Sequence, residues 1–175
     1  MKPTQILSKE HENILKITHT INEECRILDS GSQLNKDSTR KMIEFIKNYA
    51  DKFHHAKEEE ILFKEFEKCV NEEKMHCNPI EQMLFEHNEG RNFVKNMEES
   101  LEENDKDKFI TNAKGYAYLI QEHIFKEDNV LFPLIDEILT KKTQEQILKK
   151  FEQAEKKKFN KGAKEKYLSI IKQKK

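Results

Sequence analysis

Apolar side chains recur at intervals of three and four residues along four long stretches of this chain, and few helix-breaking residues interrupt them. This spacing puts the apolar side chains on one face of an α-helix. The four stretches begin near residues 4, 38, 79 and 105. The chain has 4 Gly and 3 Pro, too few for the closely spaced turns of an all-β fold. The sequence therefore predicts an all-α fold, an up-down-up-down four-helix bundle with short connections.

The expected helix ends carry ordinary stop and start signals. Ser30-Gly31-Ser32 is expected to end the first helix near Asp29, and the second is expected to run to about Lys68. Asn78-Pro79 provides a cap followed by proline in the first turn, which is typical of a helix start. Pro133 is expected to end or kink the fourth helix, because proline lacks the backbone N–H that helix continuation needs.

Charge is distributed unevenly between the body and the tail. Residues 1–139 carry 19 basic and 29 acidic side chains, whereas residues 140–175 carry 13 Lys and 4 Glu. A basic tail can bind nucleic acid or a membrane, but these lysines alternate with apolar residues such as Ile147, Phe151 and Tyr167. We therefore expect helices at about 143–158 and 164–172 that pack on the bundle, and no nucleic-acid or membrane partner. The predicted division is a bundle over residues 1–138 and a lysine-rich helical extension over residues 139–175.

No apolar run approaches the length of a membrane span, and the lysine-containing start lacks the apolar segment of a signal peptide. The three cysteines form no Cys-x-x-Cys pair and no even disulfide set. These features predict a cytoplasmic protein, either a monomer or a homodimer.

Polar residues interrupt the apolar stripes at core positions. His11, His87 and His123 occupy such positions in three helices, and Glu127 follows His123 one turn later. The second helix offers His54 with Glu58 one turn on. On a regular α-helix His54 lies at the edge of the apolar stripe and His55 lies on the far side, so His54 is the better inward candidate. A polar group in a bundle core costs free energy unless it is paired or bound to something.

These six residues also lie at one depth in the predicted bundle. When residues are counted from each inter-helix connection, the four histidines and two glutamates are level to within roughly one helical turn. Four imidazoles and two carboxylates at one level indicate a metal site, and they suit two ions better than one. Mixed nitrogen and oxygen ligation favours iron or manganese over a lone structural zinc.

The order of these elements resembles the hemerythrin-like (HHE cation-binding) family. One histidine, then His-x-x-x-Glu, then one histidine, then His-x-x-x-Glu follow one another, one element per helix. The resemblance extends over residues 4–138. Within this range, four motifs match the typical sequence pattern of the family: KEHENIL, FHHAKEEEILF, MLFEHNEGR and EHIFKEDNVLFP. The chain also repeats internally, because Glu10-His11 corresponds to Glu86-His87 and HHAKEEEILF corresponds to HIFKEDNVLF.

The resemblance implies a non-haem di-iron centre with a bridging oxo or hydroxo group, an iron–manganese pair being the variant. The implied ligands are four terminal histidines and two bridging glutamates: His11, His54, His87, His123, Glu58 and Glu127. Further residues are candidate supporting groups or alternate ligands: His55, Glu59, Asp128 and Tyr116. Oxygen carriers of this family place a second histidine on the third helix, where this chain has Met83 and Arg91 beside His87. That departure favours sensing, iron handling or redox chemistry over simple oxygen carriage.

Two classes of function follow from the resemblance. The first is a di-iron protein that binds or reduces a small oxidant (O2, H2O2 or NO) with an electron donor of unknown identity. As an enzyme it would be an oxidoreductase such as a peroxidase, a catalase or an NO reductase. The second is an iron- or oxygen-responsive sensor or interaction module without turnover. A metal-free helical adaptor is the remaining alternative.

Overall fold

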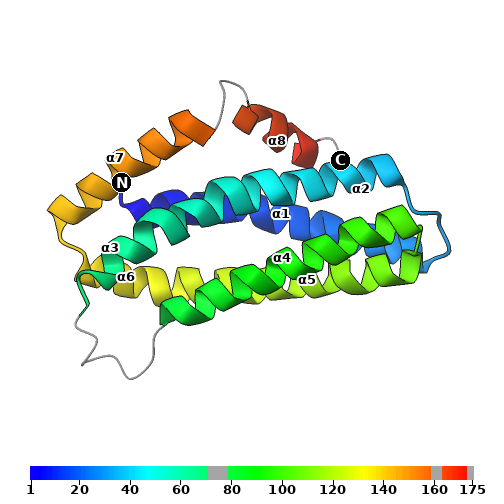
Figure 1. The fold of residues 1–175 in the computed structure, drawn as a ribbon, viewed down its shortest axis with the longest axis horizontal. Coiled ribbons are helices and arrows are strands. Elements are labelled where there is room, and N and C mark those ends of the chain that lie inside the picture. The colour runs from blue at the N-terminus through cyan, green and yellow to red at the C-terminus, as the bar shows by residue number, and fades with distance from the viewer. Residues whose placement is uncertain (71–78, 159–162, 173–175) are drawn as a thin grey trace.

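Four long helical segments run alternately up and down in the computed structural model, which describes residues 1–70, 79–158 and 163–172 (Figure 1). This arrangement confirms the predicted all-α bundle. The first segment is the single helix α1 (Pro3–Asp29), and the third is the single helix α4 (Pro79–Glu103). The second segment consists of α2 (Lys36–Phe45), η1 (Ile46–His55), η2 (Glu58–Leu62) and α3 (Phe63–Glu67). The fourth consists of α5 (Lys106–Lys126), η4 (Glu127–Leu131) and α6 (Phe132–Ile138).

Turn residues end and start these helices where the chain reverses. Gly31 has a φ of 103°, a left-handed conformation that glycine adopts without strain, and it follows the last turn of α1. The Asp105 side chain accepts a hydrogen bond from the Lys108 N–H and so caps the start of α5. Pro79 is the first residue of α4, and the predicted cap Asn78 lies outside the described residues.

The two composite segments contain π-helical turns, labelled η, in which the backbone N–H bonds five residues back. The Phe63 N–H donates to the Glu58 carbonyl, and the Phe132 N–H donates to the Glu127 carbonyl. Pro133 follows the second of these turns, and the helix continues beyond it to Ile138. Pro133 therefore does not end the helix, because the widened turn before it accommodates the missing N–H and the bulk of the ring.

The core consists of two apolar clusters, each formed by residues from several helices. One includes Ile14, Tyr49 and Ile120, and the other includes Leu7, Phe63 and Phe132. His11, at less than 2% exposed, lies in sequence between Leu7 of one cluster and Ile14 of the other. A layer of buried polar residues thus interrupts the apolar core of the bundle.

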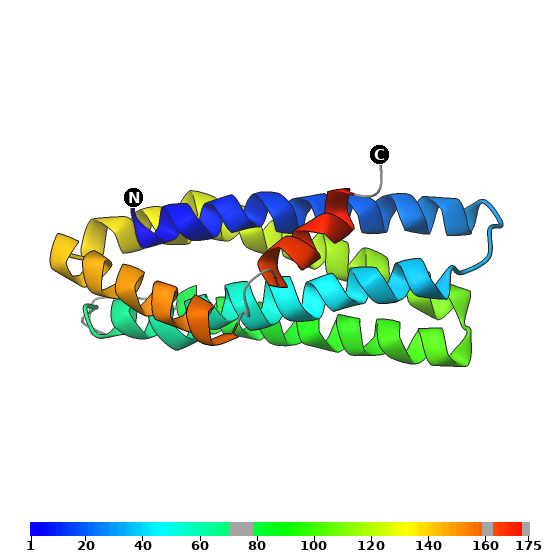
Figure 2. The same ribbon diagram turned by 90° about the horizontal axis from the view of Figure 1, so that it is seen from above.

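The C-terminal extension lies outside the bundle, across α1 and the second segment (Figures 1 and 2). It comprises α7 (Lys141–Lys158) and α8 (Ala163–Lys172). Ile147 and Phe151 of α7 are buried in the second apolar cluster, and Tyr167 and Leu168 of α8 pack against the first. Within the described ranges, no helix combines the length and apolar content needed to cross a lipid bilayer.

Candidate metal centre

The polar layer is built around two glutamates that solvent does not reach. Glu58 and Glu127 are each the first residue of a π-helical turn, and both are 0% exposed. Among the described residues, none of their four carboxylate oxygens receives a hydrogen bond. Burying a carboxylate costs several kcal/mol, about 3–5 kcal/mol when a counter-charge is removed. Two such groups side by side therefore call for cations.

Four histidine rings direct the same nitrogen, Nε2, toward these carboxylates. The Nε2 atom of His54 lies 3.2 Å from Oε1 of Glu58, and that of His123 lies 3.3 Å from Oε2 of Glu127. His11 Nε2 lies 3.2 Å from Glu127 and 3.9 Å from Glu58. His87 Nε2 lies 3.6 Å from Glu58 on its Oε2 side. Each glutamate thus faces histidines from both halves of the chain, as a carboxylate shared between two cations would.

The other ring nitrogen, Nδ1, of each histidine faces a second carboxylate. These contacts join His11 to Asp128 at 3.0 Å, His54 to Glu10 at 3.0 Å, His87 to Glu59 at 2.7 Å and His123 to Glu86 at 2.9 Å. A carboxylate that accepts the Nδ1 proton fixes the tautomer and leaves the lone pair on Nε2. The four Nε2 atoms are therefore prepared as metal ligands.

Two lysines in turn hold two of these carboxylates. Lys57 Nζ contacts Glu10 at very short range and Glu155 of α7 at 3.1 Å, and Lys126 Nζ contacts Glu86. Lys57 is 2% exposed, whereas the Lys126 side chain is 40% exposed. Apolar spacing and the His-x-x-x-Glu pattern did not single out four of these residues: Glu10, Glu86, Lys57 and Lys126. The internal repeat could have indicated them, because the patterns Glu-His and His-x-x-Lys occur in both of its halves.

The electrostatics of the layer follow from these contacts. Burial opposes protonation of His11 and His123, but the facing carboxylates outweigh it and raise the pKa of each to about 10. The pKa of Glu127 lies well below its usual value, because His123 and His11 outweigh its desolvation. The Nε2 atoms of His87 and His123 are 3.0 Å apart. Two lone pairs cannot face each other at that distance, so in the metal-free layer one of the two nitrogens carries a proton.

A fifth ring, His55, also belongs to the layer. It stacks on His87 with ring centroids 3.9 Å apart and is 5% exposed. The expectation that His55 lies on the far side of the helix is wrong, because η1 winds as a π-helix and brings both His54 and His55 inward. Burial, followed by the neighbouring His87, lowers the pKa of His55 well below its usual value. His55 is therefore neutral at pH 7.

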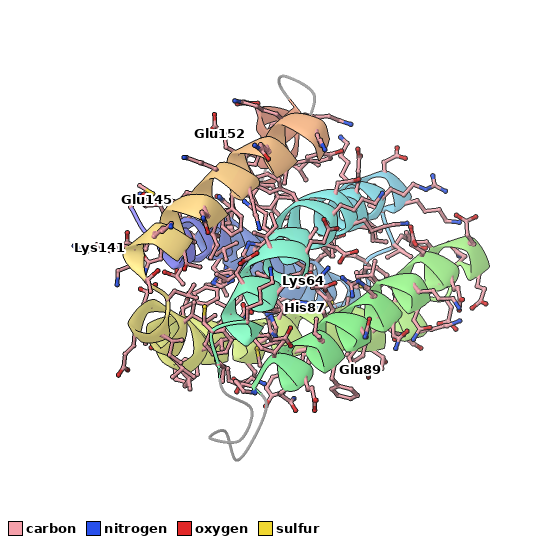
Figure 3. All side chains as sticks on the ribbon, turned by 60° about the vertical axis from the view of Figure 1, so that its left-hand side comes forward. Lys64, His87, Glu89, Lys141, Glu145 and Glu152 are labelled. Carbon is pink, nitrogen blue, oxygen red and sulfur yellow. The ribbon has the colours of Figure 1, made fainter. Side chains whose placement is uncertain are left out.

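The structure thus brings the six predicted ligands into one layer and assigns them to two groups. Donor atoms of His11, His54, Glu58 and Glu127 lie within 4.8 Å of one another, and so do those of His55, His87 and His123. Glu59 and Asp128 contact histidines instead of the centre of the layer. Tyr116 is 1% exposed, and its hydroxyl has no hydrogen-bond partner among the described residues. Figure 3 shows His87 between the second segment and α4, with Glu89 on the outer side of α4.

An antiparallel helical bundle with a buried layer of histidines and carboxylates defines a class of cation-binding bundle proteins. Residues 2–135 match the family described as the hemerythrin HHE cation binding domain. Because this match covers most of the chain, the protein belongs to the hemerythrin-like HHE cation-binding family. Comparisons with curated proteins and with solved structures gave no match.

Proposed function

We propose that this protein is a non-haem di-iron protein that binds or reduces a small oxidant such as O2, H2O2 or NO. His11 and His54 would hold one iron, His87 and His123 would hold the other, and Glu58 and Glu127 would bridge them. An oxo or hydroxo group would complete the bridge, and an iron–manganese pair would use the same donors. His55 would be a further imidazole beside the second ion.

One observation carries this proposal. Among the residues that the structure describes, none donates a hydrogen bond to the four buried oxygens of Glu58 and Glu127. Histidine nitrogens surround these oxygens, and the opposite ring atom of each histidine contacts a carboxylate. A structural role would leave these oxygens costly and unpaired. Two divalent or trivalent cations would neutralise them, and mixed imidazole and carboxylate donors suit iron and manganese.

The chain's own residues define what the site can do. When bound, a pair of irons supplies two electrons together and a position for a small ligand. The carboxylates on Nδ1 keep the imidazoles oriented and raise their basicity as ligands. The apolar clusters contain few polar groups, so they limit water at the centre and strengthen its electrostatic interactions.

The first test is the metal content of the purified chain together with its visible spectrum, measured on the wild type, His54→Ala and His123→Ala. His19→Ala is the matched control, because His19 is exposed on α1 away from the layer. About two irons per chain with near-ultraviolet absorption of an oxo-bridged pair, lost in the first two variants and kept in the control, would support the proposal. Absence of stoichiometric metal after anaerobic iron loading would overturn it.

A sensor without turnover is the second candidate, and the contact of α7 with the layer favours it. Glu155 of α7 contacts Lys57, which contacts Glu10, which holds His54. Occupancy of the layer could thereby alter the docking of α7. Catalytic consumption of peroxide or NO in the presence of a reductant would identify an oxidoreductase. A spectral or protease-sensitivity change without consumption would identify a sensor.

For the cellular setting, we propose the cytoplasm and an unidentified electron donor, in a monomer or homodimer. The free thiols of Cys25 and Cys69 support a reducing compartment.

A further inference from the structure

A cavity of about 230 Å³ lies between η1, α4 and α5, beside the histidine layer. His55 and His87 form its inner wall, and Tyr116 of α5 lines it as well. The volume is far larger than O2 or H2O2 needs, because a cavity of about 150 Å³ already holds benzene. The cavity can therefore accept a small organic molecule next to the metal centre.

Two buried polar atoms without partners belong to residues of this wall. The hydroxyl of Tyr116 and Nδ1 of His55 have no hydrogen-bond partner among the described residues, and both residues are at least 95% buried. The nearest carboxylate to His55 Nδ1, on Asp51, is 3.6 Å away, too far for a hydrogen bond. Buried polar groups normally have partners. The phenol can donate a hydrogen bond, and the unpartnered ring nitrogen of His55 can share one with a ligand hydroxyl.

The remaining wall determines the charge of a suitable ligand. Ile46, Gly90 and Val94 contribute apolar surface. Most charged residues of the wall have a close partner of opposite charge: Arg91 lies 2.7 Å from both Asp51 and Glu59, and Lys47 lies 2.7 Å from Glu98. The remaining one, Lys95, is 74% exposed and lies 3.9 Å from Glu99, so it offers its charge mainly to solvent. An ionised ligand that contacts the closely paired residues would have to break one of these pairs. An uncharged ligand would not.

We propose that this cavity binds a small uncharged organic molecule with one hydroxyl or hydroperoxyl end. Its oxygen would accept a hydrogen bond from Tyr116, its hydroxyl would also contact Nδ1 of His55, and its apolar body would contact Ile46, Gly90 and Val94. Binding itself needs no redox chemistry. Its consequence, that an alkyl hydroperoxide reaches the centre as the oxidant, rests on the proposed function.

The test uses 4-fluorophenol as the probe and fluorine NMR to measure its dissociation constant with the full chain as purified. Gly90→Val should weaken binding at least tenfold by filling the cavity. A Cβ at Gly90 makes only ordinary contacts of 3.8–3.9 Å, and Gly90→Ala is the milder variant if the valine prevents folding. Tyr116→Phe should weaken binding roughly three- to tenfold, as loss of one hydrogen bond does. Tyr118→Phe is the matched control, because Tyr118 is on the same helix and 69% exposed.

The outcomes separate this inference from the proposed function. Saturable binding that is weakened by the cavity variants and kept in the control supports it, whatever the metal content of the chain. No saturable binding, or binding that the cavity variants leave unchanged, would overturn it. Equal or tighter binding of 4-fluorobenzoate would overturn the assignment to an uncharged ligand. Metal content and thermal unfolding, measured on every variant, show whether the metal centre or the fold has failed instead.

Discussion

Each of the four histidines that contact the glutamates has one ring nitrogen committed to a carboxylate and the other directed to the centre. In the proposed centre the carboxylates would therefore support metal binding by orienting the imidazoles. Glu10→Gln keeps the size of the side chain but removes the charge that holds His54. We expect it to lower metal affinity about 10- to 100-fold, measured by competition with a chelator. Glu86→Gln should act alike on His123, and Glu12→Gln, an exposed neighbour on α1, should have no effect.

Protons take the place of metal in the metal-free chain. Because the pKa values of His11 and His123 are raised to about 10, both rings are protonated at pH 8. Metal loading requires neutral imidazoles, so it should release at least the protons of these two rings at that pH, and affinity should increase as the pH rises toward 10. A pH indicator in weak buffer measures the release. The His123→Ala variant should release fewer protons, and loading without any release would contradict the expectation.

The thiol of Cys25 provides a residue-scale test of burial at the other end of the molecule. Cys25 is 0% exposed, and burial raises its pKa to about 11. Since the thiolate is the reactive form, we expect iodoacetamide to label exposed Cys69 rapidly at pH 7 and Cys25 only after unfolding. Peptide mass spectrometry locates the label. Labelling of Cys25 in the folded chain at a rate similar to that of Cys69 would show that this end of the bundle opens readily.

At the scale of elements, α7 covers one side of the polar layer without supplying a ligand. Phe151 is 2% exposed in the second apolar cluster, and Lys57 Nζ lies 5.5 Å from the centre of its ring. A buried Phe→Ala change costs about 3–5 kcal/mol, which should undock α7 locally. We expect Phe151→Ala to speed proteolysis within α7 while the metal content stays unchanged.

Glu152→Ala is the control for that experiment, since Glu152 lies on the outer face of α7 and pairs only with exposed Lys156 (Figure 3). It should leave proteolysis at the wild-type rate. Loss of metal in the Phe151→Ala variant would show instead that α7 is part of the support of the centre.

The element scale also explains which features the sequence could predict. The three- and four-residue spacing determines which helix faces are buried, so the four segments and the common depth of the six candidate ligands could be predicted. The inward position of His55 could not, because the π-helical winding of η1 changes the angle between successive side chains and leaves no mark on an α-helical pattern. Glu10 and Glu86 flank the apolar stripe, where a glutamate is ordinarily solvated. The cavity depends on side-chain packing between three elements, which spacing does not describe.

For the whole molecule, the balance between the apolar clusters and the polar layer determines stability. Without metal, the two buried carboxylates depend on protonated histidine rings such as His11 and His123 for their counter-charge. Metal at a thousand times its dissociation constant stabilises a folded chain by about 4 kcal/mol, which corresponds to about 8–16 °C in a chain of this size. Removal of metal by a chelator should lower the Tm by that amount, measured by circular dichroism. An unchanged Tm would favour the metal-free adaptor.

The contacts of the polar layer are reciprocal between the two halves of the internal repeat. His11 of the first half is held by Asp128 of the second, and His87 of the second half is held by Glu59 of the first. Reciprocal contacts of this kind are the mark of a two-fold interface between identical subunits. A half-length hairpin could not complete the site alone, but two copies could. The two halves of the present chain are not identical, since one half carries His55 and a covered Lys57 where the other has Ile124 and an exposed Lys126.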